Sequence, residues 1–160
     1  MTVPEYADEI FQNKSKPFMP KSDYMSSVQL QNKHDPINEK MRYILIDWLL
    51  KVHEKFKLLP ETLYLTINII DRYLSKEVIS RKILQLVGVT ALHIAWKYEE
   101  IYPPEANDFV YITDNAYTKP EMLETEFKIL KALDFELTFI SSYRHLERLV
   151  AMTKNENLFK

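Results

Sequence analysis

The chain has 160 residues, a hydrophobic content of 46%, one glycine, eight prolines and no cysteine, and its formal net charge is -2. This length and hydrophobic content suffice for one domain with a single core, and the absence of cysteine excludes disulfides and cysteine-ligated metals. The small negative charge argues against a domain that binds nucleic acid through its phosphates, because such domains carry a basic surplus.

The first segment, residues 1–35, is predicted to be an arm with one short helix. The stretch "VPEYADEIFQNK" is a polar helix candidate, and "SKPFMPKSD" after it contains two prolines and is a poor helix former. No apolar leader precedes a small-residue cleavage site in residues 1–14, so we expect a nuclear or cytoplasmic location rather than secretion.

The strongest helix signal follows Asp35 and Pro36 and continues to about Phe56. Its apolar residues recur at helical spacing, at Ile37, Met41, Ile44, Leu45, Trp48, Leu49, Val52 and Phe56. These are more large apolar side chains than a surface helix needs. A second helix is predicted from Pro60, a residue type favoured in the first turn, to about Ser75.

The longest uncharged run extends from Ile83 to Trp96. As a helix with a rise of about 1.5 Å per residue it spans about 21 Å, which is short of a bilayer core of about 30 Å. It therefore predicts a buried central helix, starting after Ser80 and ending before Pro103. Gly88 costs about 1 kcal/mol against alanine in its middle, which indicates a close helix crossing.

Three further helices are predicted downstream. A short one covers about residues 107–112, and the capping-box pattern of Thr118 and Glu121 begins another that ends near Leu133. Ser141 or the serine after it could cap a sixth helix.

The sequence thus predicts an all-α fold with no competing strand pattern or internal repeat. Residues 36–138 are expected to form a bundle of five helices around the central buried one. Residues 139–160 are expected to be a linker and the start of a second fold, the rest of which is missing.

No catalytic constellation is visible in the sequence. The histidines lack metal-ligand spacing; they are His34, His53, His93 and His145. The adjacent acids Glu99 and Glu100 point apart on a helix, and there is no glycine-rich phosphate loop. His93 lies on the central helix and is interpreted as a satisfied core histidine. The prediction is a non-catalytic binding module with no cofactor and no metal.

Four charged side chains interrupt the apolar stripes of the predicted helices: Arg42, Asp71, Lys97 and Glu126. An unpaired buried charge is very costly, so each must pair within the domain or face a partner. For Arg42 with Asp71 the pattern favours a structural ion pair that locks two neighbouring helices. For Lys97 with Glu126 both interpretations stay open.

This chain resembles the cyclin box of mitotic A- and B-type cyclins over about residues 3–153. Five stretches carry the resemblance in the same order and spacing: "MRYILIDWLLKV", "ETLYLTINIIDRYLS", "LQLVGVTALHIAWKYEEIYPPE", "FVYITDNAYTK" and "ETEFKILKALDFEL". The family's hallmark positions match Arg42, Asp71, Leu86, Lys97 and Glu126. The resemblance implies a non-catalytic subunit that binds and activates a cyclin-dependent serine/threonine kinase in cell-cycle control.

The resemblance also implies two sites. The kinase-binding residues would be Tyr6, Ile10, Lys97, Tyr98, Glu99, Glu126, Phe135 and Leu137. A groove that docks Arg-x-Leu motifs of substrates or inhibitors would be formed by Met41, Ile44, Leu45, Trp48, Lys51, Gln85 and Asp114. Lys51 departs from the family, in which related mitotic cyclins carry a glutamate.

Two other interpretations remain. One is an inert single-box remnant, because the chain stops just after the start of a second fold and is a short form or a fragment. The other is the cyclin-like fold of transcription initiation factors, which binds promoter DNA and protein, although the net charge weighs against it. We expect a monomer apart from its kinase, without nucleic acid or membrane as a partner.

Overall fold

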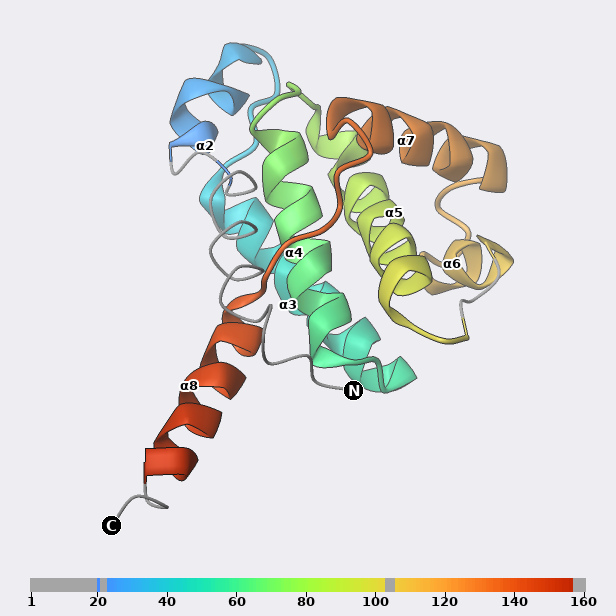
Figure 1. The fold of residues 1–160 in the computed structure, drawn as a ribbon. Coiled ribbons are helices and arrows are strands. Elements are labelled where there is room, and N and C mark those ends of the chain that lie inside the picture. The colour runs from blue at the N-terminus through green and yellow to red at the C-terminus, as the bar shows by residue number, and fades with distance from the viewer. Residues whose placement is uncertain (1–19, 21–22, 103–105, 157–160) are drawn as a thin grey trace. The chain divides into compact units, whose positions relative to one another are not determined.

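The structure, a computed structural model, describes residues 20, 23–102 and 106–156 (Figure 1). Its elements are α2 (Tyr24–Ser27), the 3-10 helix η1 (Gln29–Gln31), α3 (Glu39–Phe56), α4 (Pro60–Leu74), α5 (Arg81–Glu99), α6 (Ala106–Ile112), α7 (Lys119–Ala132) and α8 (Ser142–Glu156). None of the described residues lies in a strand, so the predicted all-α fold is confirmed. Residues Met19–Leu137 form one compact unit, and α8 belongs to a second.

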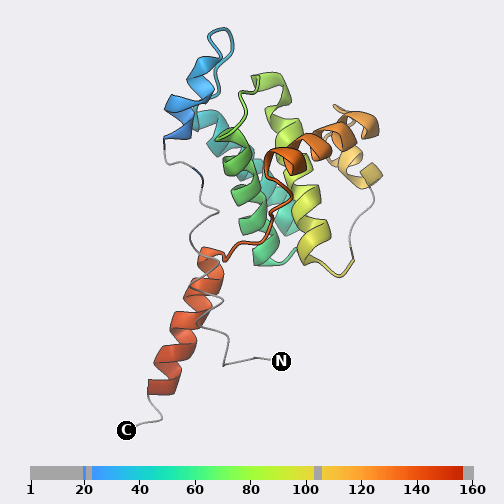
Figure 2. The same cartoon turned by 45° about the horizontal axis from the view of Figure 1, so that its top comes forward.

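The centre of the first unit is α5, as the uncharged run predicted. It contacts α3, α4, α6 and α7. Both views of the ribbon show α4 and α5 side by side, with α7 against α5 (Figures 1 and 2). Every residue from Leu86 to Trp96 is buried. A helix that is apolar on all sides needs this enclosure, because any face left open would expose apolar surface to water.

The predicted close crossing at Gly88 is confirmed. A Cβ atom at this position would lie 2.6 Å from Cδ1 of Leu45 on α3, which is closer than two carbon atoms can approach. The absence of a side chain at Gly88 therefore lets α3 and α5 pack directly against each other.

The start of α3 lies a few residues later than predicted. Asn38 is the N-cap, and its Oδ1 accepts a hydrogen bond of 3.0 Å from the backbone N–H of Met41. This side chain satisfies one of the free N–H groups of the first turn, which fixes Glu39 as the first helical residue. Ile37 precedes the helix but is still buried, at 1% exposure.

The N-terminus of α4 is capped from another helix. Oε1 of Glu100, directly after α5, accepts hydrogen bonds of 2.7 Å from the backbone N–H of Leu59 and from the hydroxyl of Thr62. A carboxylate is favourable there because the first N–H groups of a helix are unpaired and carry partial positive charge. One of the two adjacent acids noted in the sequence thus has a structural role.

The caps of the last two helices agree with the sequence. Thr118 and Glu121 form a reciprocal capping box at α7. At α8, Oγ of Ser141 accepts a hydrogen bond of 3.1 Å from the backbone N–H of Arg144. Helix α8 exposes apolar residues, namely Leu146, Leu149 and Val150.

The N-terminal segment differs from the predicted arm. The helix candidate "VPEYADEIFQNK" lies outside the described residues, whereas the unpredicted elements α2 and η1 bring Tyr24 and Gln29 into buried positions. Nε2 of Gln29 donates to the backbone oxygens of Leu74 and Glu77, both at 2.7 Å. Part of segment 1–35 therefore packs against the end of α4.

In the part of the chain that the structure describes, no helix combines the length and apolar character needed to cross a bilayer.

Candidate functional site

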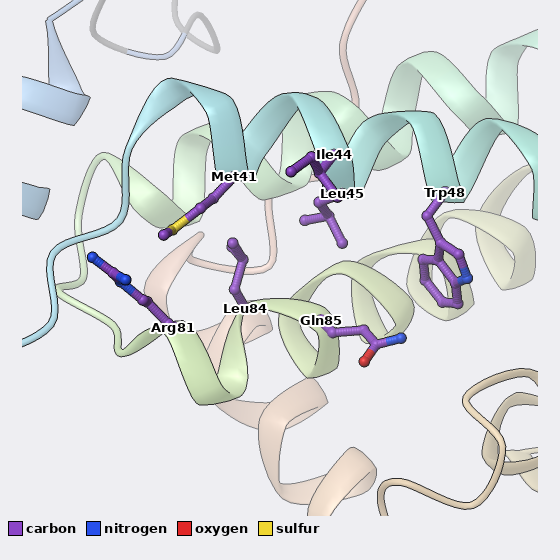
Figure 3. A pocket seen from close by; sticks show the side chains of 7 residues that line it. All are labelled: Met41, Ile44, Leu45, Trp48, Arg81, Leu84 and Gln85. Atoms are coloured by element: carbon purple, nitrogen blue, oxygen red, sulfur yellow. The ribbon is translucent and has the colours of Figure 1, made fainter.

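An apolar groove runs between α3 and α5, with a volume of about 420 Å³ (Figure 3). Its lining consists of Met41, Ile44, Leu45 and Trp48 from α3 and of Arg81, Leu84 and Gln85 from α5. Figure 3 shows Met41, Leu45 and Trp48 extending from α3 toward α5, and Leu84 extending from α5 toward α3. Residues three and four apart share one face of a helix, and the spacing within both sets follows that rule.

Two lining residues, Arg81 and Leu84, were missed by the sequence analysis. Arg81 lies four residues before Gln85 and Leu84 lies three residues after Arg81, so helical spacing extended from Gln85 could have found both. Arg81 is held in place by Asp35, whose Oδ1 lies 2.7 Å from Nε, while Oδ2 accepts a hydrogen bond from the Arg81 backbone N–H at 3.0 Å. This pair fixes a guanidinium at one end of the groove.

Two residues expected at the groove do not line it. Lys51 forms an ion pair of 2.7 Å with Asp47, one turn earlier on α3, and both side chains are exposed. This contact raises the pKa of the Lys51 ammonium. Asp114 follows α6 in the left-handed conformation, with φ of 54°, and is exposed.

Arg42 and Asp71 form a bidentate ion pair between α3 and α4. Nε and the terminal nitrogen of Arg42 donate to the two carboxylate oxygens of Asp71 at 2.7 and 2.5 Å. The hydroxyl of Tyr24 donates to the same carboxylate at 2.7 Å. Burial and the Asp71 carboxylate raise the pKa of Tyr24, and the hydrogen bond to Asp71 raises that of Arg42. The cluster joins α2, α3 and α4, which matches the interpretation of Arg42 and Asp71 as a structural ion pair. The sequence analysis did not anticipate the contribution of Tyr24.

Lys97 and Glu126 lie together at the surface, between the end of α5 and α7. Nζ of Lys97 contacts Oε1 of Glu126, and the two side chains are 39% and 13% exposed. Oε2 of the same carboxylate lies 3.2 Å from Nδ1 of the buried His93. The nearby imidazole and the Lys97 ammonium lower the pKa of Glu126 to about 2, although burial acts in the opposite direction. The carboxylate therefore stays ionised under all ordinary conditions.

The other expected kinase-binding residues are partly accessible. Tyr98 and Phe135 are 48% and 62% exposed, whereas Glu99 and Leu137 are half-buried. Tyr6 and Ile10 lie outside the described residues. Next to Glu126 on α7, Phe127 is 60% exposed, a feature that the sequence analysis did not single out. Within the described ranges no three His, Asp or Glu side chains cluster so as to hold a metal ion.

Comparison with known proteins identifies the family. Residues 8–138 match the family model described as "Cyclin, N-terminal domain". G2/mitotic-specific cyclin-B of Marthasterias glacialis is 52% identical over 136 residues, which cover 83% of this chain and 33% of that protein. Cyclin-B1-3 of Arabidopsis thaliana is 51% identical over 150 residues, covering 91% and 34%.

A solved structure supports the same assignment. The viral cyclin from herpesvirus saimiri superposes with a TM-score of 0.61 at 28% identity, over 64% of this chain and 45% of the viral chain. The present chain spans about a third of the length of the curated relatives it matches. It belongs to the cyclin family, and within that family to the mitotic B-type cyclins.

Proposed function

We propose that this chain is a non-catalytic regulatory subunit that binds and activates a cyclin-dependent serine/threonine kinase in cell-cycle control. The observation that carries the proposal is the Lys97–Glu126 pair, in which the lysine is 39% exposed at the surface of a cyclin fold and the glutamate beside it is 13% exposed. A lysine ammonium has three donors, and one contact to Glu126 leaves capacity for acceptor groups of a partner. Exposed Tyr98 supplies apolar surface next to the pair.

The proposed activation mechanism is that a rigid surface of this chain holds the C helix of the kinase in its active position. A kinase transfers a phosphoryl group only when its own lysine, the glutamate of its C helix and its magnesium-binding aspartate are aligned. The surface formed by the end of α5 and by α7 would hold that C helix inward. Because α5 is enclosed by four other helices, it is a stiff support for this contact.

The test is direct titration of a mitotic cyclin-dependent kinase with the purified chain. A one-to-one complex by calorimetry and a rise in phosphorylation of a histone-type substrate would support the proposal. Binding without a rise in activity would identify an inert box. Absence of binding to any member of a kinase panel would contradict the proposal altogether. The family match does not favour the alternative of a promoter-binding factor.

We further propose that the groove between α3 and α5 docks Arg-x-Leu motifs of substrates or inhibitors. Its apolar lining supports this, because a contiguous exposed apolar patch of this kind is typical of a recognition site. Arg81 and Gln85 supply polar groups that could orient a peptide backbone.

Gly88→Ala is expected to weaken docking while leaving the box folded. The new methyl group would displace Cδ1 of Leu45, a groove residue, and so change the shape of the groove. The gain in helix propensity, about 1 kcal/mol, offsets the cost of moving a flexible side chain. We expect about tenfold weaker binding of a labelled Arg-x-Leu peptide by fluorescence anisotropy, because a pocket misfit of one methyl group has roughly that effect. Unchanged affinity would show that Leu45 moves without altering the groove.

Lys51→Glu is expected to strengthen the binding of basic Arg-x-Leu peptides. It would turn the exposed row Asp47, Lys51, Glu54 from alternating charge into three acids at one edge of α3. For exposed charges the gain should be about two- to fivefold at low salt and should shrink as salt screens it. The matched control is Lys128→Glu, because Lys128 forms the same type of exposed pair, with Glu124 on α7. Equal changes in both variants would show that Lys51 has no local effect on the groove.

A further inference from the structure

His93 is a buried side chain of α5 that contacts the surface pair from inside. It is 4% exposed and lies one helical turn before Lys97, on the same face. Its Nδ1 lies 3.2 Å from Oε2 of Glu126, while Lys97 contacts Oε1. The carboxylate is therefore held on one side by a core imidazole and on the other by a surface ammonium.

The imidazole ring is itself fixed by the core. The ring of Phe109 on α6 packs edge-on against it, with centroids 4.8 Å apart and an interplanar angle of 64°. Phe109 is fully buried and packs in the same manner against Trp96, at 5.5 Å. Because close-packed rings of this kind have one arrangement, the position of Nδ1 is set by the packing of α5 against α6.

The contact with Glu126 determines which nitrogen of the His93 ring must carry a hydrogen. A carboxylate oxygen accepts hydrogen bonds only, so Nδ1 attracts it when that nitrogen carries a hydrogen and repels it when the nitrogen presents a lone pair. Among the described residues, neither Nδ1 of His93 nor Oε2 of Glu126 has a hydrogen-bond partner of good geometry, although the two atoms lie 3.2 Å apart. An unpaired buried donor and acceptor 3.2 Å apart are each other's natural partners.

We propose that His93 is a positioning residue for the kinase-facing pair: from within the core it fixes the Glu126 carboxylate in the orientation that Lys97 completes at the surface. The inference rests on the proposed function, since the orientation matters to a kinase only if the chain binds one. A carboxylate held by two partners loses less side-chain freedom when a kinase engages it, so binding is tighter than to a mobile one.

The first test uses the unaltered chain. Long-range proton–nitrogen NMR correlation reports which imidazole nitrogen of His93 carries hydrogen. The proposal requires hydrogen on Nδ1, and a ring protonated on Nε2 alone would overturn it. This measurement does not depend on any variant being folded.

The second test compares variants of His93. His93→Phe keeps a ring against Phe109 but removes both nitrogens, and His93→Asn keeps a donor near the position of Nδ1. We expect about tenfold weaker kinase binding for the phenylalanine variant, with binding largely restored by asparagine. In the phenylalanine variant, carbon-detected NMR should show the pKa of Glu126 rising from about 2 toward the ordinary range for a glutamate. Thr90→Val is the matched control, because Thr90 is a buried residue of α5 whose hydroxyl has no hydrogen-bond partner among the described residues.

The two readouts separate the failure of this inference from that of the proposed function. If the unaltered chain binds no kinase, the proposed function is wrong, and the Glu126 titration still decides whether His93 positions the carboxylate. If the chain binds a kinase but His93→Phe binds as tightly and leaves the titration unchanged, the positioning role is refuted. A loss of kinase binding that asparagine does not restore also refutes it, because the ring nitrogen would then not be the cause.

Discussion

Arg42→Ala is expected to lower the free energy of unfolding by about 3 kcal/mol, and the melting temperature by about 6–12 °C, because removing one partner strands a buried charge. The Asp71 side chain is 10% exposed and, among the described residues, would keep the hydroxyl of Tyr24 as its remaining hydrogen-bond partner. Removing one member of a fully buried pair typically costs about 3–5 kcal/mol. The lower end applies here, because the Arg42 side chain is 30% exposed and water can partly replace it. Urea and thermal denaturation followed by circular dichroism measure the loss.

Lys51→Ala is the matched control for this stability prediction. It breaks another ion pair of α3, but that pair is exposed, at 70% for Lys51 and 47% for Asp47. Exposed pairs contribute little to stability, so the melting temperature should hardly change. If both variants lost the same stability, burial would not be the reason for the effect of Arg42. A stable Arg42→Ala variant that failed to bind a kinase would place Arg42 in the interface instead.

The main helices could be predicted because local signals define them. In α3, α4 and α5 the apolar residues recur at helical spacing. Helix α4 begins at Pro60, and α5 begins after Ser80 and ends at Glu99, four residues before Pro103. The start of α3 was misplaced because Ile37 continues the apolar pattern although Asn38 is the cap. A buried residue just before a helix fits the period as well as one inside it.

The elements α2 and η1 could not be predicted from the sequence. With four and three residues they are too short to show any period. Gln29 is buried there because its side chain pairs with backbone groups of Leu74, Glu77 and Ile79, which lie 45 to 50 residues later in the chain. Such partners become visible only when the fold brings the two segments together.

The candidate site could also be predicted from the sequence in part. Helical spacing marked Lys97 and Glu126 as charges on apolar stripes, and the structure brings them into contact. Spacing also placed His93 on the stripe of Lys97, but it could not show that α7 packs against α5 in the register that sets Glu126 beside the imidazole. Sequence patterns identify faces of helices, whereas the pairing of two faces is a property of the tertiary packing.

Lys97→Ala and Glu126→Ala are each expected to weaken kinase binding by about 10- to 150-fold, because charge-assisted hydrogen bonds contribute about 1.5–3 kcal/mol each. Isothermal calorimetry with a mitotic cyclin-dependent kinase measures the change. The matched control is Lys128→Ala, which removes an equally charged side chain from α7 and breaks only the exposed pair with Glu124. If the control lost as much affinity as the two variants, the effect would come from net charge alone.

Lys97→Ala and Glu126→Ala should differ in how their stability changes with pH. The pKa of Glu126 is lowered to about 2 in the folded box, below its value of about 4.3 in an unfolded chain. Its ionised form therefore stabilises the box fully above about pH 5, and this contribution is lost as the pH falls from there toward 2. Glu126→Ala removes the contribution, so its stability should decline less than that of the unaltered chain between pH 6 and pH 3. Lys97→Ala keeps the contact of Glu126 with His93, so a substantial acid-dependent decline should persist. A Glu126→Ala variant with the full acid-dependent decline would show that the carboxylate is not held by the core, and that any loss of kinase binding arises from the surface contact alone.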